Sequence, residues 1–274
     1  MPDSRLYHYT SLAGLIGILE SRSLWASGIR YLNDGAEFTY AVDLLADALD
    51  EAVVRRPDLA SVFEIPRRSL FHYDDGPGAG TGDVFVVSLS EDGDTLSQWR
   101  AYCPPGAGVS IAFDVGHLKV LALEQTFRFD RCVYDPTEQR GMVARLIDGF
   151  IPAAERAAMA FDDDQFYAAS DFLSHFELVA PFLKHPSFAE EREWRVVVQN
   201  TRASSVKFRA VRTLLVPYMG FSLQMSSGRL PISHVVIGPT PHPHLNAGAI
   251  QAALAAVGLS TVGTGTSATP FRAW

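Results

Sequence analysis

Hydrophobic and polar positions along the chain follow two different periods. Alternating or β-branched runs predict strands near the start and the end, whereas the middle repeats its apolar positions with helical spacing. We expect strands at residues 6–9, 23–26, 84–89, 109–113, 127–134, 193–199, 206–210, 214–216 and 234–237. We expect helices at residues 12–19, 35–55, 136–183 (with a break at Pro152) and 247–257.

This order of elements predicts an α+β fold rather than a repeating βαβ fold. We expect a mixed, largely antiparallel sheet core with flanking and inserted helices. The chain, 1–274, is interpreted as a single domain with a helical insertion at about 136–183. The Gly- and Asp-rich segment 74–82 is expected to be a surface loop, and whether it forms a lid is left open.

Composition and charge bear on whether the protein binds nucleic acid, crosses a membrane or is secreted. The 274 residues carry a net charge of -8, which disfavours sequence-blind binding to nucleic acid. No apolar stretch is long enough to span a membrane, and the N-terminus lacks the pattern of a secretory signal. Cys103 and Cys132 have no metal-binding spacing and are interpreted as free thiols. We therefore expect a cytoplasmic protein with no membrane contact.

The first candidate residues lie at the end of the first expected strand, in Tyr7-His8-Tyr9-Thr10-Ser11. Alternation places His8 on the face opposite Tyr7 and Tyr9. A histidine beside two hydroxyls, just before a helix, can hold a sugar hydroxyl or a phosphate. The alternative is a core histidine next to an ordinary helix cap.

A second group precedes the second helix. Asn33, Asp34 and Glu37 are explained by a turn and a capping box. Capping does not explain Arg30 and Tyr31, and an aromatic ring beside a cation can stack on a ligand ring or meet a phosphate.

Polar residues also follow the expected central strand. Ser88 and Ser90 end that strand, where polar groups often line a cleft. Trp99, Arg100 and Tyr102 lie on a short helix just beyond, and core packing is the alternative explanation for the two aromatic residues.

A carboxylate pair stands at the start of a late strand, in Glu191-Arg192-Glu193-Trp194-Arg195. Alternation puts the tryptophan towards the core and both glutamates with Arg195 on the other face. Two carboxylates near a cation can stabilise a developing positive charge. The alternative is a solvated edge strand with weak surface ion pairs.

No metal site is expected. His242-Pro243-His244 has no third or fourth ligand at a matching spacing. A metal-dependent nuclease using Asp92, Glu191 and Glu193 is the lowest-ranked function.

The chain resembles a bacterial domain-of-unknown-function family, number twenty-nine seventy-one, over nearly its whole length. The matching residues are Tyr7 to Ser11, Arg30 to Asp34 with Glu37, Ser88 to Ser90, Ser97 to Arg100, Glu191 to Arg195, Ile237 to Pro239 and Pro270 to Arg272. More weakly, His8-Tyr9-Thr10 and Glu191-Arg192-Glu193 resemble the H-x-T and E-x-E patterns of ADP-ribosyltransferases. This second resemblance implies a split sheet and NAD as substrate.

Residue roles follow from the ADP-ribosyltransferase resemblance alone. It implies that His8 and Thr10 hold NAD ribose hydroxyls, that Glu193 is the catalytic carboxylate and that Glu191 orients the acceptor. Tyr31 would stack on nicotinamide. The remaining cofactor-binding candidates are Ser88, Ser90 and Arg100.

The implied function is an NAD-dependent ADP-ribosyltransferase that modifies a macromolecule, as a toxin or defence effector with a neutralising antitoxin or other partner protein. The acceptor (protein, nucleic acid or small molecule) and the oligomeric state stay open. The alternatives are an NAD glycohydrolase, a small-molecule ADP-ribosyl or nucleoside transferase, and a non-catalytic nucleotide- or protein-binding module.

Overall fold

The computed structural model describes residues 5–32, 36–70, 83–160, 162–200, 205–211 and 213–270. The predicted capping residues Asn33 and Asp34, the 74–82 loop, and Phe271 with Arg272 lie outside the described residues, as does the side chain of Glu37. Within those ranges, no helix is both long enough and apolar enough to cross a membrane.

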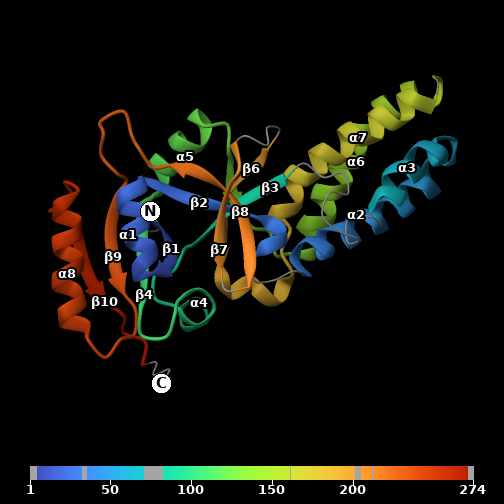
Figure 1. Cartoon of the computed structure of the whole chain (residues 1–274). Helices are drawn as coiled ribbons and strands as arrows, with labels where there is room; N and C mark the ends of the chain where they lie inside the picture. Colours follow the sequence, from blue (N-terminus) through green and yellow to red (C-terminus); the bar gives the residue numbers. More distant parts are fainter. Residues whose placement is uncertain are drawn as a thin grey trace.

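The described strands form one ten-stranded sheet in the order β10-β9-β4-β1-β3-β2-β8-β7, with β6 and β5 paired beside β3 (Figure 1). All its pairings are antiparallel except that of β9 with β10. The predicted α+β class with a mixed, largely antiparallel sheet is therefore confirmed. The strands are β1 (Arg5–Ser11), β2 (Ser23–Gly28), β3 (Asp83–Ser90), β4 (Gly108–Asp114), β5 (Arg128–Arg131), β6 (Glu193–Asn200), β7 (Lys207–Val211), β8 (Leu214–Ser222), β9 (Ile232–Ile237) and β10 (Gly263–Thr266).

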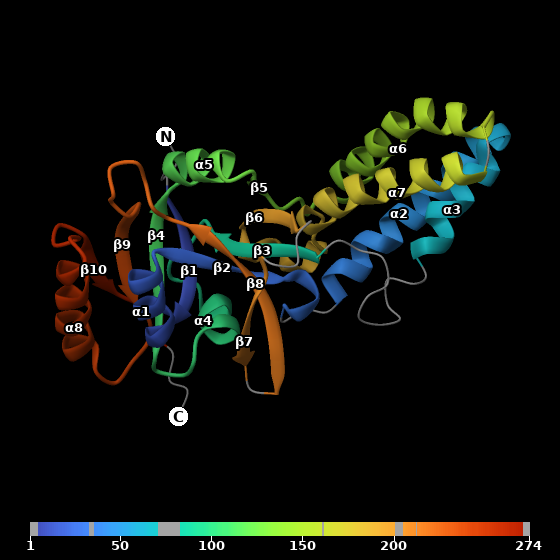
Figure 2. The same cartoon turned by 45° about the horizontal axis from the view of Figure 1, so that its top comes forward.

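The sheet forks at β3. One edge of β3 pairs with β6 along its whole length, from Asp83 to Ser90. The other edge pairs with β1 only at Ser90 and with β2 only at Phe85 and Val86. Beyond these contacts β1 pairs with β4 on its far side, and β2 pairs with β8. The two halves of the sheet therefore diverge from β3 (Figure 2). This fork positions the candidate site.

Three helices pack on the sheet and form one core with it: α1 (Leu12–Ser21), α5 (Val115–Glu124) and α8 (Pro243–Ala256). A fourth helix, α4 (Leu96–Tyr102), packs against β1, with the Trp99 ring edge-on to Tyr9. The Ser11 hydroxyl accepts a hydrogen bond from the backbone N–H of Gly14 at 2.9 Å, which caps the start of α1 as its sequence predicts. Leu15, Ile18 and Leu19 then pack into the core with Val87 and Leu89 of β3 and other apolar side chains of the sheet.

A second core holds a helical arm that projects from the sheet (Figure 1). The arm consists of α2 (Ala36–Arg55), η2 (Pro57–Leu59), α3 (Ala60–Leu70), α6 (Pro136–Ala158) and α7 (Asp162–Val179). The predicted insertion at 136–183 therefore packs against another helical segment, 36–70, that is distant in sequence. The expected break at Pro152 is wrong: α6 continues to Ala158. The residue four positions earlier, Asp148, is exposed, so water can replace the hydrogen bond that proline cannot donate.

Three short 3₁₀ segments join the arm to the sheet: η1 (Ile29–Tyr31), η3 (Ala180–Phe182) and η4 (Pro186–Glu191). A small third cluster of buried apolar residues contains Ile29 of η1, Val86 of β3 and Phe182 of η3. This junction holds η4, which carries Glu191, beside the fork.

Candidate functional site

A cleft of about 600 Å³ opens where β1 and β2 part. Its walls come mainly from α1, the strands β1, β2 and β3, and β7. Much of its lining is polar, including His8, Ser27, Tyr31, Ser88, Tyr102 and Arg209. A second cavity of about 40 Å³ shares His8, Ser88 and Tyr102 with the cleft and adds Ser90, Glu191 and Glu193. The two cavities therefore adjoin at His8. The smaller is large enough for a hydroxyl group or a water molecule.

The His8 side chain lies where β1 and β2 diverge along β3. Its Nδ1 lies 3.0 Å from the backbone oxygen of Ser88, at a position where neither β1 nor β2 pairs with β3. Because a carbonyl oxygen only accepts, Nδ1 donates, and Nε2 of the neutral ring keeps its acceptor lone pair. Burial lowers the pKa of His8, and the hydrogen bond to Ser88 opposes that shift only in part. His8 is thus a neutral acceptor facing both cavities.

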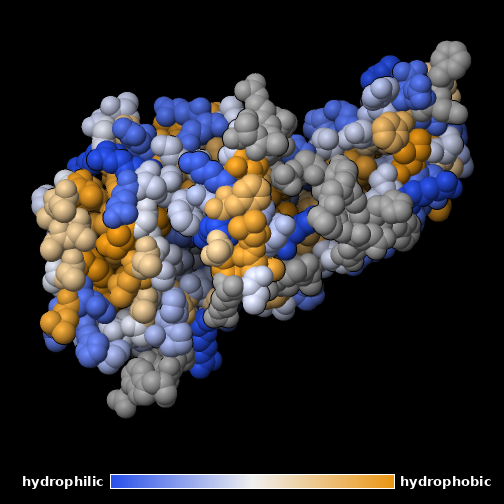
Figure 3. Space-filling model, viewed as in Figure 1, coloured by the Kyte–Doolittle hydropathy of each residue, from blue (hydrophilic) through white to orange (hydrophobic). Residues whose placement is uncertain are grey.

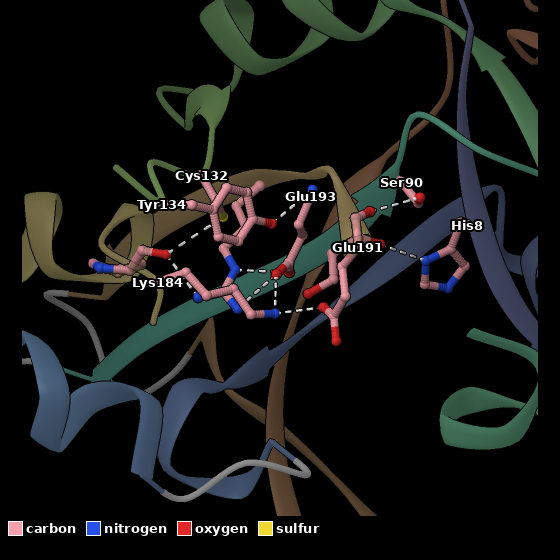
Figure 4. A network of polar contacts seen from close by, with 10 residues as sticks. His8, Ser90, Cys132, Tyr134, Lys184, Glu191 and Glu193 are labelled. Carbon is pink, nitrogen blue, oxygen red and sulfur yellow. Dashed lines mark hydrogen bonds and ion pairs between the residues drawn. The ribbon is translucent and has the colours of Figure 1, made fainter. Parts of the chain in front are cut away.

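Strand register brings the carboxylates to the same place. Ser90 of β3 stands opposite Tyr7 of β1 on one side and opposite Glu193 of β6 on the other. The Ser90 hydroxyl also donates to the backbone oxygen of Glu191 at 2.8 Å. Arg192 adopts a left-handed conformation (φ 42°) between η4 and β6. Residues that are distant in sequence, His8 and the Glu191–Glu193 pair, therefore line the same small cavity and lie close together in Figure 4.

Glu193 is the centre of a buried ion network (Figure 4). Its Oε2 accepts from Lys184 Nζ at 2.6 Å, and Arg195 donates to Oε1 at 2.7 Å and to Oε2 at 3.0 Å. Lys184 also lies 2.5 Å from Oε2 of Glu191. Arg195 directs a further hydrogen bond at the backbone oxygen of Pro181. The alternative of a solvated edge strand is wrong, because β6 runs between β3 and β5 and both Glu193 and Arg195 are buried.

The network fixes the charge of Glu193. Burial alone would raise the pKa of this carboxyl, but the charges of Arg195 and Lys184 and their hydrogen bonds outweigh that effect and lower the pKa to about 2. Of the roughly four lone-pair positions of a carboxylate, three are taken by the two cations. One position, on Oε1, is left for a ligand hydroxyl.

Residues of the helical arm are hydrogen-bonded to the segments that carry this network. Gln139 of α6 donates to the backbone oxygens of Val133 at 2.6 Å and Lys184 at 2.7 Å. Tyr40 of α2 donates in turn to Oε1 of Gln139 at 2.6 Å. The Tyr134 hydroxyl accepts from the backbone N–H of Glu193 at 2.9 Å. Both inserted helical segments therefore help to hold the lysine in place.

The structure distributes the predicted site residues over the two cavities. Thr10 and Tyr31 line the cleft, Ser90, Glu191 and Glu193 line the smaller cavity, and His8 and Ser88 line both. Arg100 does not belong to this group. Its side chain is exposed on α4 and lines neither cavity, because the buried side of that helix presents Gln98 and Trp99.

Two important side chains were missed from the sequence. Lys184 lies nine positions before Glu193, in a segment that shows no period, and only the η4 turn brings them together. Arg209 stands in a short strand whose alternation is typical of an exposed edge, yet its head reaches the cleft. A lysine at the end of the apolar run 179–183 was the available signal for Lys184, whereas Arg209, between Lys207 and Arg212, offered none.

Other sequence candidates remain outside the site. Cys103 and Cys132 are free thiols, and burial raises the pKa of Cys103 to about 12. His242 and Pro243 begin α8, away from the cleft. Among the side chains that the structure describes, no group of three or more His, Cys, Asp or Glu is placed to hold a metal ion.

The fold and site define an α+β protein with a forked, largely antiparallel sheet, in which a histidine and a carboxylate pair line a small cavity beside a larger cleft. Residues 98–196 match a family described as "Protein of unknown function (DUF2971)". The match confirms the family predicted from the sequence over this segment, which contains Lys184, Glu191, Glu193 and Arg195. No curated protein and no solved structure matches the chain.

Proposed function

We propose that the chain is an NAD-dependent ADP-ribosyltransferase whose active site is the cleft at the fork. The observation that supports this most is the meeting of His8 from β1 with Glu191 and Glu193 beside β6 in adjoining cavities. The cleft volume of about 600 Å³ is in the range of small-molecule sites. The ADP-ribosyltransferase resemblance requires just these two chain segments to share one ligand.

Each side chain has a role that its geometry permits. The free Nε2 of neutral His8 accepts a hydrogen bond from a ribose hydroxyl, and Thr10 lies beside it on the same strand. Tyr31, at the edge of the cleft, stacks on the nicotinamide ring. The remaining acceptor position on Glu193 Oε1 takes the 2′-hydroxyl of the ribose that is cleaved.

The reaction breaks the bond between nicotinamide nitrogen and ribose C1′. Nicotinamide leaves with the bonding electron pair, and positive charge develops on C1′ and the ring oxygen, as in glycoside hydrolysis. Glu193, held ionised by its two cations, stabilises that charge through the 2′-hydroxyl. An acceptor heteroatom then bonds to C1′, and its proton passes to Glu191.

One observation favours a second candidate, a non-catalytic nucleotide-binding module. Lys184 and Arg195 together balance the charges of Glu191 and Glu193, and they fill most of the acceptor positions on Glu193. A carboxylate so neutralised does less for a developing cation than an unpaired one. Binding of ADP-ribose without turnover of NAD is the result that selects this candidate.

The test is incubation of the purified protein with NAD, labelled in its adenylate phosphate, and cell extract. We expect release of nicotinamide together with label on a macromolecule, whereas free labelled ADP-ribose alone indicates a glycohydrolase. Glu191→Gln removes the proton acceptor and should slow label transfer at least about tenfold. Glu190→Gln is the matched control, since Glu190 is exposed and bonds only to Ser97 among the contacts found. No nicotinamide release by the wild type contradicts the proposal.

By the same resemblance we propose that the protein acts inside the cytoplasm as a toxin or defence effector with a neutralising partner. Induced expression should then arrest growth. The same induction of Glu191→Gln should not, at equal protein level. Equal growth of the two cultures would contradict this role without bearing on NAD cleavage.

A further inference from the structure

Arg209 is a half-buried cation that has no carboxylate partner among the described side chains. It lies on β7 and reaches across β8 to β2, where it donates to the Ser27 hydroxyl at 2.8 Å. Its guanidinium carbon lies 5.4 Å from the centre of the Trp25 ring. Its Nε is buried and has no hydrogen-bond partner among the residues that the structure describes. A donor in that state requires a ligand or water to satisfy it.

The other cations of the site differ from Arg209 in this respect. Arg195 binds both oxygens of Glu193 and the backbone oxygen of Pro181. Lys184 is held between Glu191 and Glu193. Both charges are compensated within the protein, so neither is available to an anion. Arg209 lines the same cleft, and no described carboxylate pairs with it.

We propose that Arg209 and Ser27 form a phosphate-binding subsite in the cleft, which takes the diphosphate group of a dinucleotide. A guanidinium binds phosphate oxygens with two parallel N–H groups, and a hydroxyl beside it supplies a third donor. The proposal rests on the proposed function only in taking the cleft as the ligand site.

The position of the subsite fits a diphosphate linking two riboses. Ser27 stands opposite Val86 of β3, and the His8 side chain contacts Ser88 of the same strand two residues further on. Arg209 is also close enough for its charge to lower the pKa of His8. Phosphate on Arg209 therefore places an attached ribose next to His8. In a protein with a net charge of -8, a local cation is needed to offset the repulsion of an anionic ligand.

The hairpin that carries Arg209 leaves apolar side chains exposed on its two strands. Phe208 of β7 and Leu214 and Leu215 of β8 are all more than half exposed. Figure 3 shows this hydrophobic strip over the hairpin.

The experiment is calorimetric titration of the full-length protein with ADP-ribose, alone and in competition with inorganic pyrophosphate. Adenosine, which lacks phosphate, is titrated in parallel. We expect pyrophosphate to compete with ADP-ribose. Arg209→Gln should weaken ADP-ribose binding about 10- to 100-fold while leaving adenosine binding unchanged. Arg209→Lys should recover part of the loss, because lysine restores the positive charge but lacks the planar guanidinium with its parallel N–H groups.

Arg229→Gln is the matched control, with the same change of charge at an exposed position where the side chain bonds to Thr261. Equal ADP-ribose affinity of Arg209→Gln and Arg229→Gln overturns the subsite, and so does failure of pyrophosphate to bind the wild type. Thermal unfolding of each variant identifies any loss of fold. Competent pyrophosphate binding with no NAD cleavage would overturn the proposed function and leave the subsite standing.

Discussion

Lys184 and Glu193 form an ion pair in the interior, with Nζ 2.6 Å from Oε2 and side chains that are only 1% and 4% exposed. The pair lies at the base of the site, where η4 meets β6. Burial makes this pair important for the free energy of unfolding, because a buried charge without its partner destabilises the fold strongly.

We predict that Lys184→Met destabilises the protein by about 3–5 kcal/mol, because Glu191 and Glu193 are then held together without the lysine. Lys207→Met, at an exposed position on β7, should change the free energy of unfolding by no more than about 0.5 kcal/mol. Urea unfolding of both variants measures the difference. Equal stability of the two would show that the ion network is not structural.

Acid should weaken the fold through Glu193. The pKa of this carboxyl is about 2 in the folded protein and near its ordinary value of 4.5 when unfolded. The charged form therefore stabilises the fold above pH 4.5, and this contribution is lost as the pH falls from about 4.5 to about 2. Urea unfolding across this range measures the slope. In Glu193→Gln the free energy of unfolding should change less steeply with pH over this range. An unchanged slope against pH would contradict the assigned pairing.

His8 should add a second pH dependence with its own window. Its pKa is lowered in the folded protein, so below about 6.5 the unfolded chain binds the proton more readily. Stability should consequently fall as the pH drops below 6.5. His8→Gln, which can still donate to the Ser88 carbonyl, should remove this component. Melting temperatures between pH 5 and 7.5 provide the measurement, and parallel curves for the two proteins would refute it.

Gly17 allows the cleft to be blocked without changing its chemistry. A Cβ added to this residue of α1 meets nothing within 4 Å, and Gly17 lines the cleft. Gly17→Ala should stabilise the helix by about 0.5–1 kcal/mol and leave ligand binding unaltered. Gly17→Trp should fill the space and abolish ADP-ribose binding with the fold retained. Calorimetry on both variants tests this, and full binding by the tryptophan variant would place the ligand elsewhere.

Periodicity predicted much of the fold because most elements bury one clear face. The strands around Val86, Ile111 and Val196 and the helices at α1, α2 and α6 lie where their patterns place them. The α3 helix was missed because Pro57 and Pro66 obscure a pattern that only the arm completes. On α1, Ile18 packs into the core, whereas Ile16 points to solvent.

The site was only partly predictable. Two motifs distant in sequence singled out His8, Glu191 and Glu193, which line the same small cavity, and a motif can be recognised without knowledge of contacts. The fork that unites them depends on β3 pairing with three strands, and no local pattern shows that. The salt bridges of Lys184 and the unpaired charge of Arg209 are likewise tertiary properties.

The most direct test of the account is a crystal structure of the protein bound to an NAD analogue whose cleaved ribose carries a methylene group in place of the ring oxygen. The account predicts that the analogue fills the cleft, with one ribose hydroxyl at His8 Nε2 and the 2′-hydroxyl of the modified ribose at Glu193 Oε1. An analogue bound outside the fork, or a cleft that stays empty at saturating concentration, would contradict it.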